Sequence, residues 1–164
     1  MIGYFKQKLF TKFNNLTNSV TNSLNLKIII IFILYMKTIV ISGSIKKAGE
    51  EIEQFAKELE TLGYKVIYPK SDLRTTDWNA LSNEALTKLY KGLTIEYFAF
   101  IERCDALFIY NKEGYCGNSV TMELAYGYVM KKPIYALMKD IEISRDVLFD
   151  NYAQTPTELD NLLK

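Results

Sequence analysis

The feature that most constrains the fold is an alternation that runs along the chain from Met36 onward. Short, β-branched apolar runs alternate with longer segments whose apolar residues recur three or four positions apart. This pattern predicts βαβ units with right-handed crossovers, and therefore a parallel sheet with helices on both faces. We expect strands over 38–42, 64–68, 106–110 and 133–137, and helices near 50–62, 82–103, 120–131 and 156–163. Ligands of such sheets bind at the carboxyl ends of the strands.

The first 35 residues do not share this pattern. Residues 1–25 are rich in Asn, Thr and Ser, and 28–36 form an apolar run that falls well short of the roughly 20 residues a membrane-spanning helix needs. Three interpretations are open: a membrane tether, an extra edge element, or an upstream extension of a reading frame that starts at Met36. We favour the last, because the segment after Met36 runs straight into a buried strand. The expected organisation is an N-terminal extension over 1–35 and one α/β domain over 36–164.

Composition excludes several kinds of chemistry and partner. The formal net charge of +1 is too small to indicate binding of duplex nucleic acid. Cys104 and Cys116 are too few for a disulfide framework and are not spaced as zinc ligands, which indicates reduced thiols and a cytoplasmic location. The chain has no histidine, so the commonest metal ligand and every histidine-dependent triad are missing. We therefore expect no metal and no cofactor, and chemistry that depends on carboxylates, tyrosines, lysines or backbone amides.

The end of the first predicted strand carries a turn of small residues followed by lysines. Ser42, Gly43 and Ser44 precede Lys46 and Lys47 just before a helix. Amides at a helix N-terminus with an ammonium nearby suit a phosphate or another anion. The alternative is a plain βα turn with solvated lysines.

The end of the third predicted strand carries a loop over 111–119, which is longer than the two to six residues typical of such connections. We expect the Asn118–Ser119 pair to cap the next helix. Candidate binding residues of the loop are Tyr115, Gly117, Asn118 and Ser119.

Glu123 is the candidate catalytic residue, since it falls in the opening turns of the helix that follows this loop. The helix dipole is expected to keep its carboxylate ionised, and the small Gly127 to leave room for a ligand. The alternative is that Glu123 only complements the dipole. Asp72 and Asp77 are expected near the same edge, and Tyr115, Tyr126 and Trp78 are candidates to stack on a nucleobase. Cys116 is near the expected site, but no histidine is present to activate it as a nucleophile.

Several segments resemble the nucleoside 2-deoxyribosyltransferase family, which includes the deoxynucleoside 5'-monophosphate N-glycosidases. They are the turn SGSIK from Ser42, CDALFI over 104–109, MELAY over 122–126 and KPI over 132–134, and the similarity spans roughly 37–137. The resemblance implies a flavodoxin-like doubly wound sheet. It also implies that Glu123 attacks the anomeric carbon to form a covalent glutamyl–sugar intermediate, and that Ser44 and Lys46 contact a phosphate.

The chain departs from the family pattern at two places. Ala125 stands where the family usually has glycine, and the second acid is not cleanly placed, because Tyr97 falls near its position and Glu96 is one residue away. A shift of one residue rotates a side chain by about 100° around a helix.

The expected function is cleavage or transfer at the N-glycosidic bond of a (deoxy)nucleoside or nucleoside 5'-monophosphate, with this small molecule as partner. The alternative is a non-catalytic nucleotide-binding sensor on the same fold. We also expect a homodimer or higher oligomer, because Phe98 and Phe100 lie outside the main apolar stripe of their helix and family members complete their sites with a neighbouring subunit.

Overall fold

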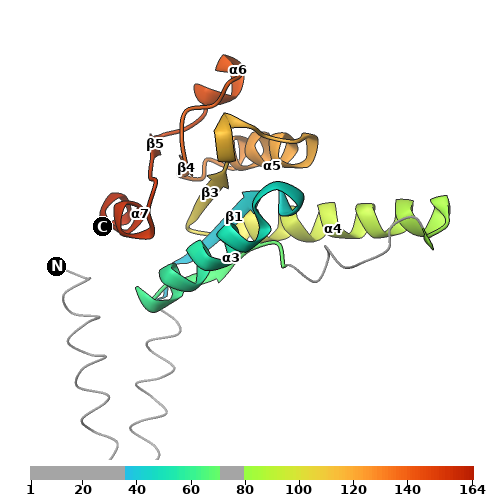
Figure 1. Cartoon of the computed structure of the whole chain (residues 1–164), viewed down its shortest axis with the longest axis horizontal. Helices are drawn as coiled ribbons and strands as arrows, with labels where there is room; N and C mark the ends of the chain where they lie inside the picture. The colour runs from blue at the N-terminus through green and yellow to red at the C-terminus, as the bar shows by residue number, and fades with distance from the viewer. Residues whose placement is uncertain (1–35, 71–79) are drawn as a thin grey trace, which may run out of the picture.

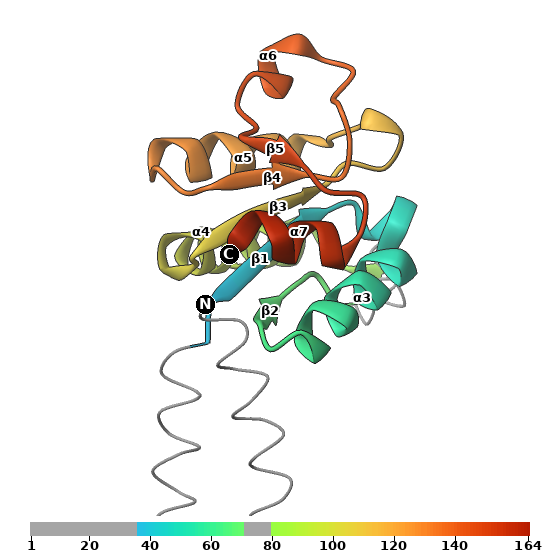
Figure 2. The same cartoon turned by 90° about the vertical axis from the view of Figure 1, so that its left-hand side faces the viewer.

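The computed structural model describes residues 36–70 and 80–164, which form a parallel sheet with helices on both faces (Figures 1 and 2). The interpretations of residues 1–35, Asp72, Asp77 and Trp78 lie outside the described residues. The sheet has the order β2-β1-β3-β4-β5, and every neighbouring pair is parallel. This is the flavodoxin-like strand order, so the expected fold class is confirmed. The strands are β1 (Thr38–Gly43), β2 (Lys65–Ile67), β3 (Ala106–Tyr110), β4 (Ile134–Ala136) and β5 (Asn151–Tyr152).

Two helices cover each face of the sheet. Alternate residues of β1 point to opposite faces, because side chains in a strand alternate: Ile39 and Ile41 belong to one core cluster and Val40 to the other. The first cluster includes residues of α3 (Ile45–Thr61) and α7 (Pro156–Leu163). The second includes residues of α4 (Asn83–Arg103) and α5 (Asn118–Val129). A 3₁₀ turn (Lys112–Gly114) and the short α6 (Ile143–Asp146) lie in the connecting segments.

The local signals in the sequence explain where these elements begin and end. The apolar residues of α3 that recur at helical spacing are all buried, and Gly63 follows the helix with a positive φ of 92°, as expected of a C-terminal cap. At the start of α4, the Ser82 side chain accepts a hydrogen bond from the amide of Ala85. The exposed two-residue strand β5 was not expected, because so short a segment carries no periodic signal.

Helix α4 runs out past the edge of the sheet, so that only its C-terminal part packs on the body (Figure 1). Its one fully buried residue is Ile101. Phe98 stacks on Tyr126, and Phe100 packs edge-on against Tyr97, so the expectation that these two phenylalanines form a free apolar surface is wrong. The homo-oligomer stays a prediction, and it now depends on other side chains of α4, Tyr90 and Ile95, which are 53% and 58% exposed.

The described part of the chain has no helix that is both long and apolar enough to cross a membrane.

Candidate functional site

The candidate site is centred on a hydrogen bond between β1 and α5. Ser42 is the last residue but one of β1 and is fully buried, and its Oγ donates to Oε2 of Glu123. Ser42 pairs with Ile109 of β3, which also lies near the end of its strand. Ser42 is therefore at the carboxyl ends of the two central strands. Glu123 lies in the second turn of α5, which begins directly after the β3–α5 loop. The sequence placed both residues near this edge, and the structure brings them into contact.

The carboxyl group of Glu123 has an unusually high pKa. Burial raises its pKa from 4.5 to about 7, while the hydrogen bond from Ser42 opposes this shift. The expectation that the helix dipole keeps Glu123 ionised is therefore wrong. The dipole acts mainly within the first turn, and Glu123 lies one turn further along α5. A carboxyl group with a pKa near 7 at the carboxyl ends of parallel strands is typical of a nucleophile or an acid–base group.

Tyr97 of α4 completes the surroundings of Glu123. Its hydroxyl donates to the carbonyl oxygen of Ile41 at 2.7 Å. Burial and then the nearby charge of Glu123 raise the pKa of Tyr97 well above its ordinary value, so the phenol stays neutral. Sequence reasoning noted Tyr97 only as the occupant of a position near the expected second acid. Glu96 is exposed, and within residues 36–70 and 80–164 no second carboxylate alters the pKa of Glu123.

The turn between β1 and α3 brings further predicted binding residues to this edge. A Cβ on Gly43 would lie 2.7 Å from Cδ1 of Ile52 and 3.0 Å from Cβ of Tyr110, so close packing requires glycine there. Ser44 is the N-cap residue of α3, yet its side chain makes no capping hydrogen bond. Lys46 is exposed at the start of the helix. The turn therefore presents a hydroxyl group, an ammonium group and the first amides of α3 together.

The loop between β3 and α5 lies beside this turn. Nζ of Lys47 lies 3.8 Å from the ring centroid of Tyr115, a cation–π contact that joins the two segments. Gly117, not the Asn118–Ser119 pair, is the N-cap residue, so the expected side-chain cap is wrong and α5 begins two residues earlier than expected. Asn118 and Ser119 are exposed in the first turn of α5, where their side chains are accessible to a ligand.

Gly127 does not leave room for a ligand, contrary to expectation. A Cβ at this position would lie 2.6 Å from Cδ2 of Leu107. The glycine therefore allows α5 to pack closely on β3, and the space beside it is filled by the core.

The β3–α5 loop is anchored by residues that the sequence did not single out. Asn111 is buried, and its side-chain nitrogen donates to the carbonyl oxygen of Met138 at 2.7 Å while its side-chain oxygen accepts from the amide of Met138 at 3.1 Å. The Cys116 thiol donates to the buried Asp140, which also accepts two hydrogen bonds from Arg145. Burial and the bond to Asp140 raise the pKa of Cys116 to about 12, so this thiol is not a nucleophile at neutral pH. These contacts hold the loop on the segment that follows β4.

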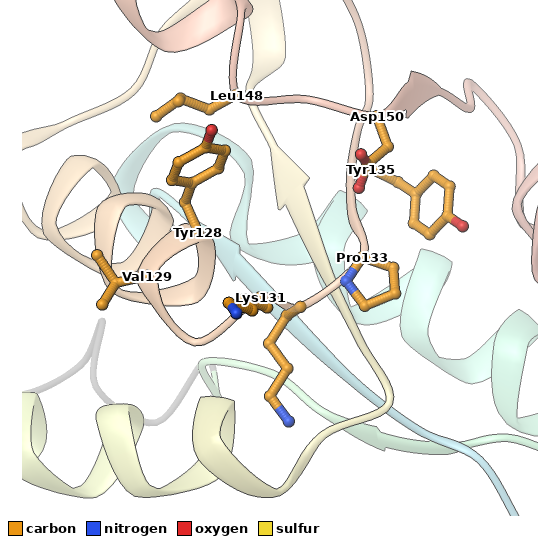
Figure 3. Close-up of a pocket in the computed structure, with 8 residues that line it drawn as sticks. Tyr128, Val129, Lys131, Pro133, Tyr135, Leu148 and Asp150 are labelled. Atoms are coloured by element: carbon orange, nitrogen blue, oxygen red, sulfur yellow. The ribbon is translucent and has the colours of Figure 1, made fainter.

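An open hollow of about 760 Å³ lies away from Glu123, at the amino end of β4, and Figure 3 shows Tyr128 of α5 reaching toward Leu148 on one side of it. Asp150 accepts a hydrogen bond from the amide of Ile134, and the ammonium of Lys132 donates to backbone carbonyls of Glu102 and Cys104. These polar groups already have partners within the fold. The hollow is lined by Tyr128, Val129, Lys131, Lys132, Pro133, Tyr135, Leu148 and Asp150.

Comparison with known proteins gives structural neighbours alone. No family model matches the sequence. No curated protein matches it either. The chain is similar to the solved structure of a 2-deoxyribosyltransferase from Bacillus psychrosaccharolyticus, with 17% identity and a TM-score of 0.49 over 76% of this chain and 90% of the other. It is also similar to the CMP N-glycosidase BcmB of Clostridium botulinum, with 18% identity and a TM-score of 0.47 over 77% and 98% of the two chains.

A third similar structure is a conserved protein from Enterococcus faecalis V583, with 14% identity and a TM-score of 0.44 over 77% of this chain and 87% of the other. The similar structures thus include a 2-deoxyribosyltransferase and a CMP N-glycosidase. The activity of this chain is argued below from its own residues.

Proposed function

We propose that the protein cleaves or transfers the N-glycosidic bond of a nucleoside or nucleoside 5'-monophosphate, with Glu123 as the nucleophile. The observation that carries the proposal is the half-buried carboxyl group of Glu123, whose pKa is about 7 and which Ser42 holds at the carboxyl edge of the sheet. This chemistry needs no histidine and no metal, which suits a chain without histidine.

The reaction is a double displacement. The Glu123 carboxylate attacks the anomeric carbon of the sugar as the bond from this carbon to the base breaks, and the base leaves with its bonding electrons and takes up a proton. This step gives a glycosyl ester of Glu123 and passes through an oxocarbenium-like transition state that the negative carboxylate stabilises. Water, or a nitrogen of another base, then attacks the same carbon, gives up its proton to the solvent and releases the carboxylate. Two inversions retain the configuration of the sugar.

The two segments beside Glu123 would bind the rest of the substrate. We propose that Ser44, Lys46 and the first amides of α3 bind the 5'-phosphate, since a hydroxyl, a cation and helix N-terminal amides suit this anion. Gly43 would lie beside the sugar. Ser42, which the sequence suggested as a binding residue, is fully buried and would act only through its hydrogen bond to Glu123. The base would lie along the β3–α5 loop, where Tyr115, Gly117, Asn118 and Ser119 line the same edge and Tyr115 offers an aromatic face for stacking.

The second candidate function is a non-catalytic nucleotide sensor in which Glu123 only accepts a hydrogen bond from a sugar hydroxyl. The observation that favours it is that, in the described part of one protomer, no second carboxylate stands close enough to alter the pKa of Glu123. A sensor binds the same ligands through the same two segments and releases no base.

Release of free base from a panel of nucleosides and 5'-monophosphates, followed by chromatography, separates the two candidates. We expect base release by the wild-type protein and by Glu60→Gln, a matched control on an exposed carboxylate of α3. Glu123→Gln should release almost none. Tight binding of a nucleotide without base release from any member of the panel would instead establish the sensor.

A further inference from the structure

We propose that Ser42 is a positioning residue for Glu123, whose hydroxyl holds Oε2 of the carboxyl group and thereby leaves Oε1 as the oxygen that attacks the sugar. The inference rests on the proposed function for its catalytic meaning. The contact itself is a property of the protein without substrate.

The position of Ser42 in the sheet makes its hydroxyl a rigid donor. Ser42 is fully buried and has no access to water, and its pairing with Ile109 of β3 fixes its backbone. Ser42, Asn111 and Asp140 are the buried polar side chains of the described residues. Asn111 and Asp140 fasten the β3–α5 loop to the segment after β4, whereas the acceptor of the Ser42 hydroxyl is the candidate nucleophile.

The hydrogen bond from Ser42 gives the two carboxylate oxygens of Glu123 different roles. A serine hydroxyl has one proton to donate, and in this protein it goes to Oε2 of Glu123. Among the described residues, no other hydrogen bond reaches the Glu123 carboxyl group, so Oε1 is left without a protein donor. An oxygen without a donor keeps its lone pairs for attack, while the bound oxygen fixes the plane of the carboxyl group.

Tyr97 cannot take over the role of Ser42. Its hydroxyl is already donated to the carbonyl oxygen of Ile41, and its phenol stays neutral beside Glu123. Tyr97 of α4 is the titratable group that faces Glu123 from another element, and no charged side chain among the described residues offsets the burial of the carboxyl group. Loss of the Ser42 hydroxyl therefore leaves the carboxylate with no donor from the described part of the chain, which should raise its pKa further.

The test is a titration of the side-chain carboxyl carbons by ¹³C NMR in the protein without ligand, with the Glu123 signal assigned through Glu123→Gln. We expect Ser42→Ala to raise the midpoint of Glu123 by about one to two pH units, which is the size expected for a lost hydrogen bond to a charged group. Ser42→Cys, which keeps a weaker donor, should fall between the two. The control Ser144→Ala removes another serine bonded to a glutamate, the exposed Glu142, and should leave the midpoint unchanged.

Kinetics then connect the contact to catalysis. In Ser42→Ala, kcat should fall about tenfold to a hundredfold with little change in KM, and the acidic limb of kcat/KM should move to higher pH together with the NMR midpoint. An unchanged Glu123 midpoint in both Ser42→Ala and Ser42→Cys overturns the inference. A shifted midpoint in a protein that cleaves no nucleoside leaves the Ser42 contact established and refutes the proposed function, so the two failures are distinguishable.

Discussion

Replacing Glu123 with glutamine should make the protein more stable at pH 8 and leave its stability almost unchanged at pH 4, below the pKa of the unfolded state. The folded protein raises the pKa of Glu123 from 4.5 to about 7, because burial disfavours the charged form. Between these two values the folded state binds more protons than the unfolded state. The free energy of unfolding therefore falls as the pH rises through this window. Glutamine keeps the shape and an oxygen that accepts the Ser42 hydrogen bond, but it carries no charge to bury.

The magnitude follows from the size of the pKa shift. A shift from 4.5 to about 7 corresponds to about 3 kcal/mol if it is fully expressed. Partial contact of the half-buried side chain with water reduces this value, so we expect Glu123→Gln to exceed the wild type by about 1.5 to 3 kcal/mol at pH 8. The gain would reflect the cost of holding a carboxylate ready for chemistry, as at other strained functional sites.

Urea unfolding of both proteins at pH 4, 5, 6, 7 and 8 measures this difference. Subtracting the two curves cancels the contributions of all other titrating groups. A difference that stays constant with pH, or a Glu123→Gln variant that is less stable at pH 8, would refute the claim that burial of the Glu123 carboxylate is costly.

Three further predictions concern packing, loop anchoring and ligand binding. Gly127→Ala should lower the free energy of unfolding by about 1–3 kcal/mol, because the added Cβ would collide with Leu107. Gly92→Ala in α4 should raise it by about 0.5–1 kcal/mol, because the added Cβ would meet no described side chain within 4 Å. Thermal melts of the two variants measure both changes. Arg145→Met should cost about 3–5 kcal/mol by leaving the buried Asp140 without its cation, with faster hydrogen exchange in the 111–119 loop. Lys46→Ala should weaken binding of a 5'-monophosphate by about 1.5 kcal/mol and leave nucleoside binding unchanged in calorimetry, and equal losses would remove phosphate recognition from this turn.

Most of the architecture could be predicted because it is encoded locally. The apolar spacing of Ile52, Phe55 and Leu59 defines one buried helix face, and the β-branched run of β1 defines a central strand. The end of α3 at Gly63 also follows from a local signal. Strand β5 escaped prediction, because two exposed residues can join a sheet edge through backbone hydrogen bonds without any pattern of side chains.

The site could be predicted only in part, because its chemistry depends on contacts between distant segments. Ser42 and Glu123 are 81 positions apart, and their hydrogen bond and the raised pKa appear only when β1 and α5 pack together. The same holds for the bond from Tyr97 to the backbone of β1 and for the ion pair of Asp140 and Arg145. A helix position suggested an ionised Glu123, but burial outweighs the dipole beyond the first turn.

The most direct test of the central claim is mass spectrometry of the protein after reaction with a 2-fluorinated deoxynucleoside analogue, which slows breakdown of the glycosyl ester. We predict a mass increase of one fluorinated sugar on the peptide that contains Glu123, and no such increase in Glu123→Gln. The variant should also lose on the order of a thousandfold or more in rate, which is about 4 kcal/mol of transition-state stabilisation. Turnover by the wild type with no adduct on Glu123, together with a nearly unimpaired Glu123→Gln, would contradict the account.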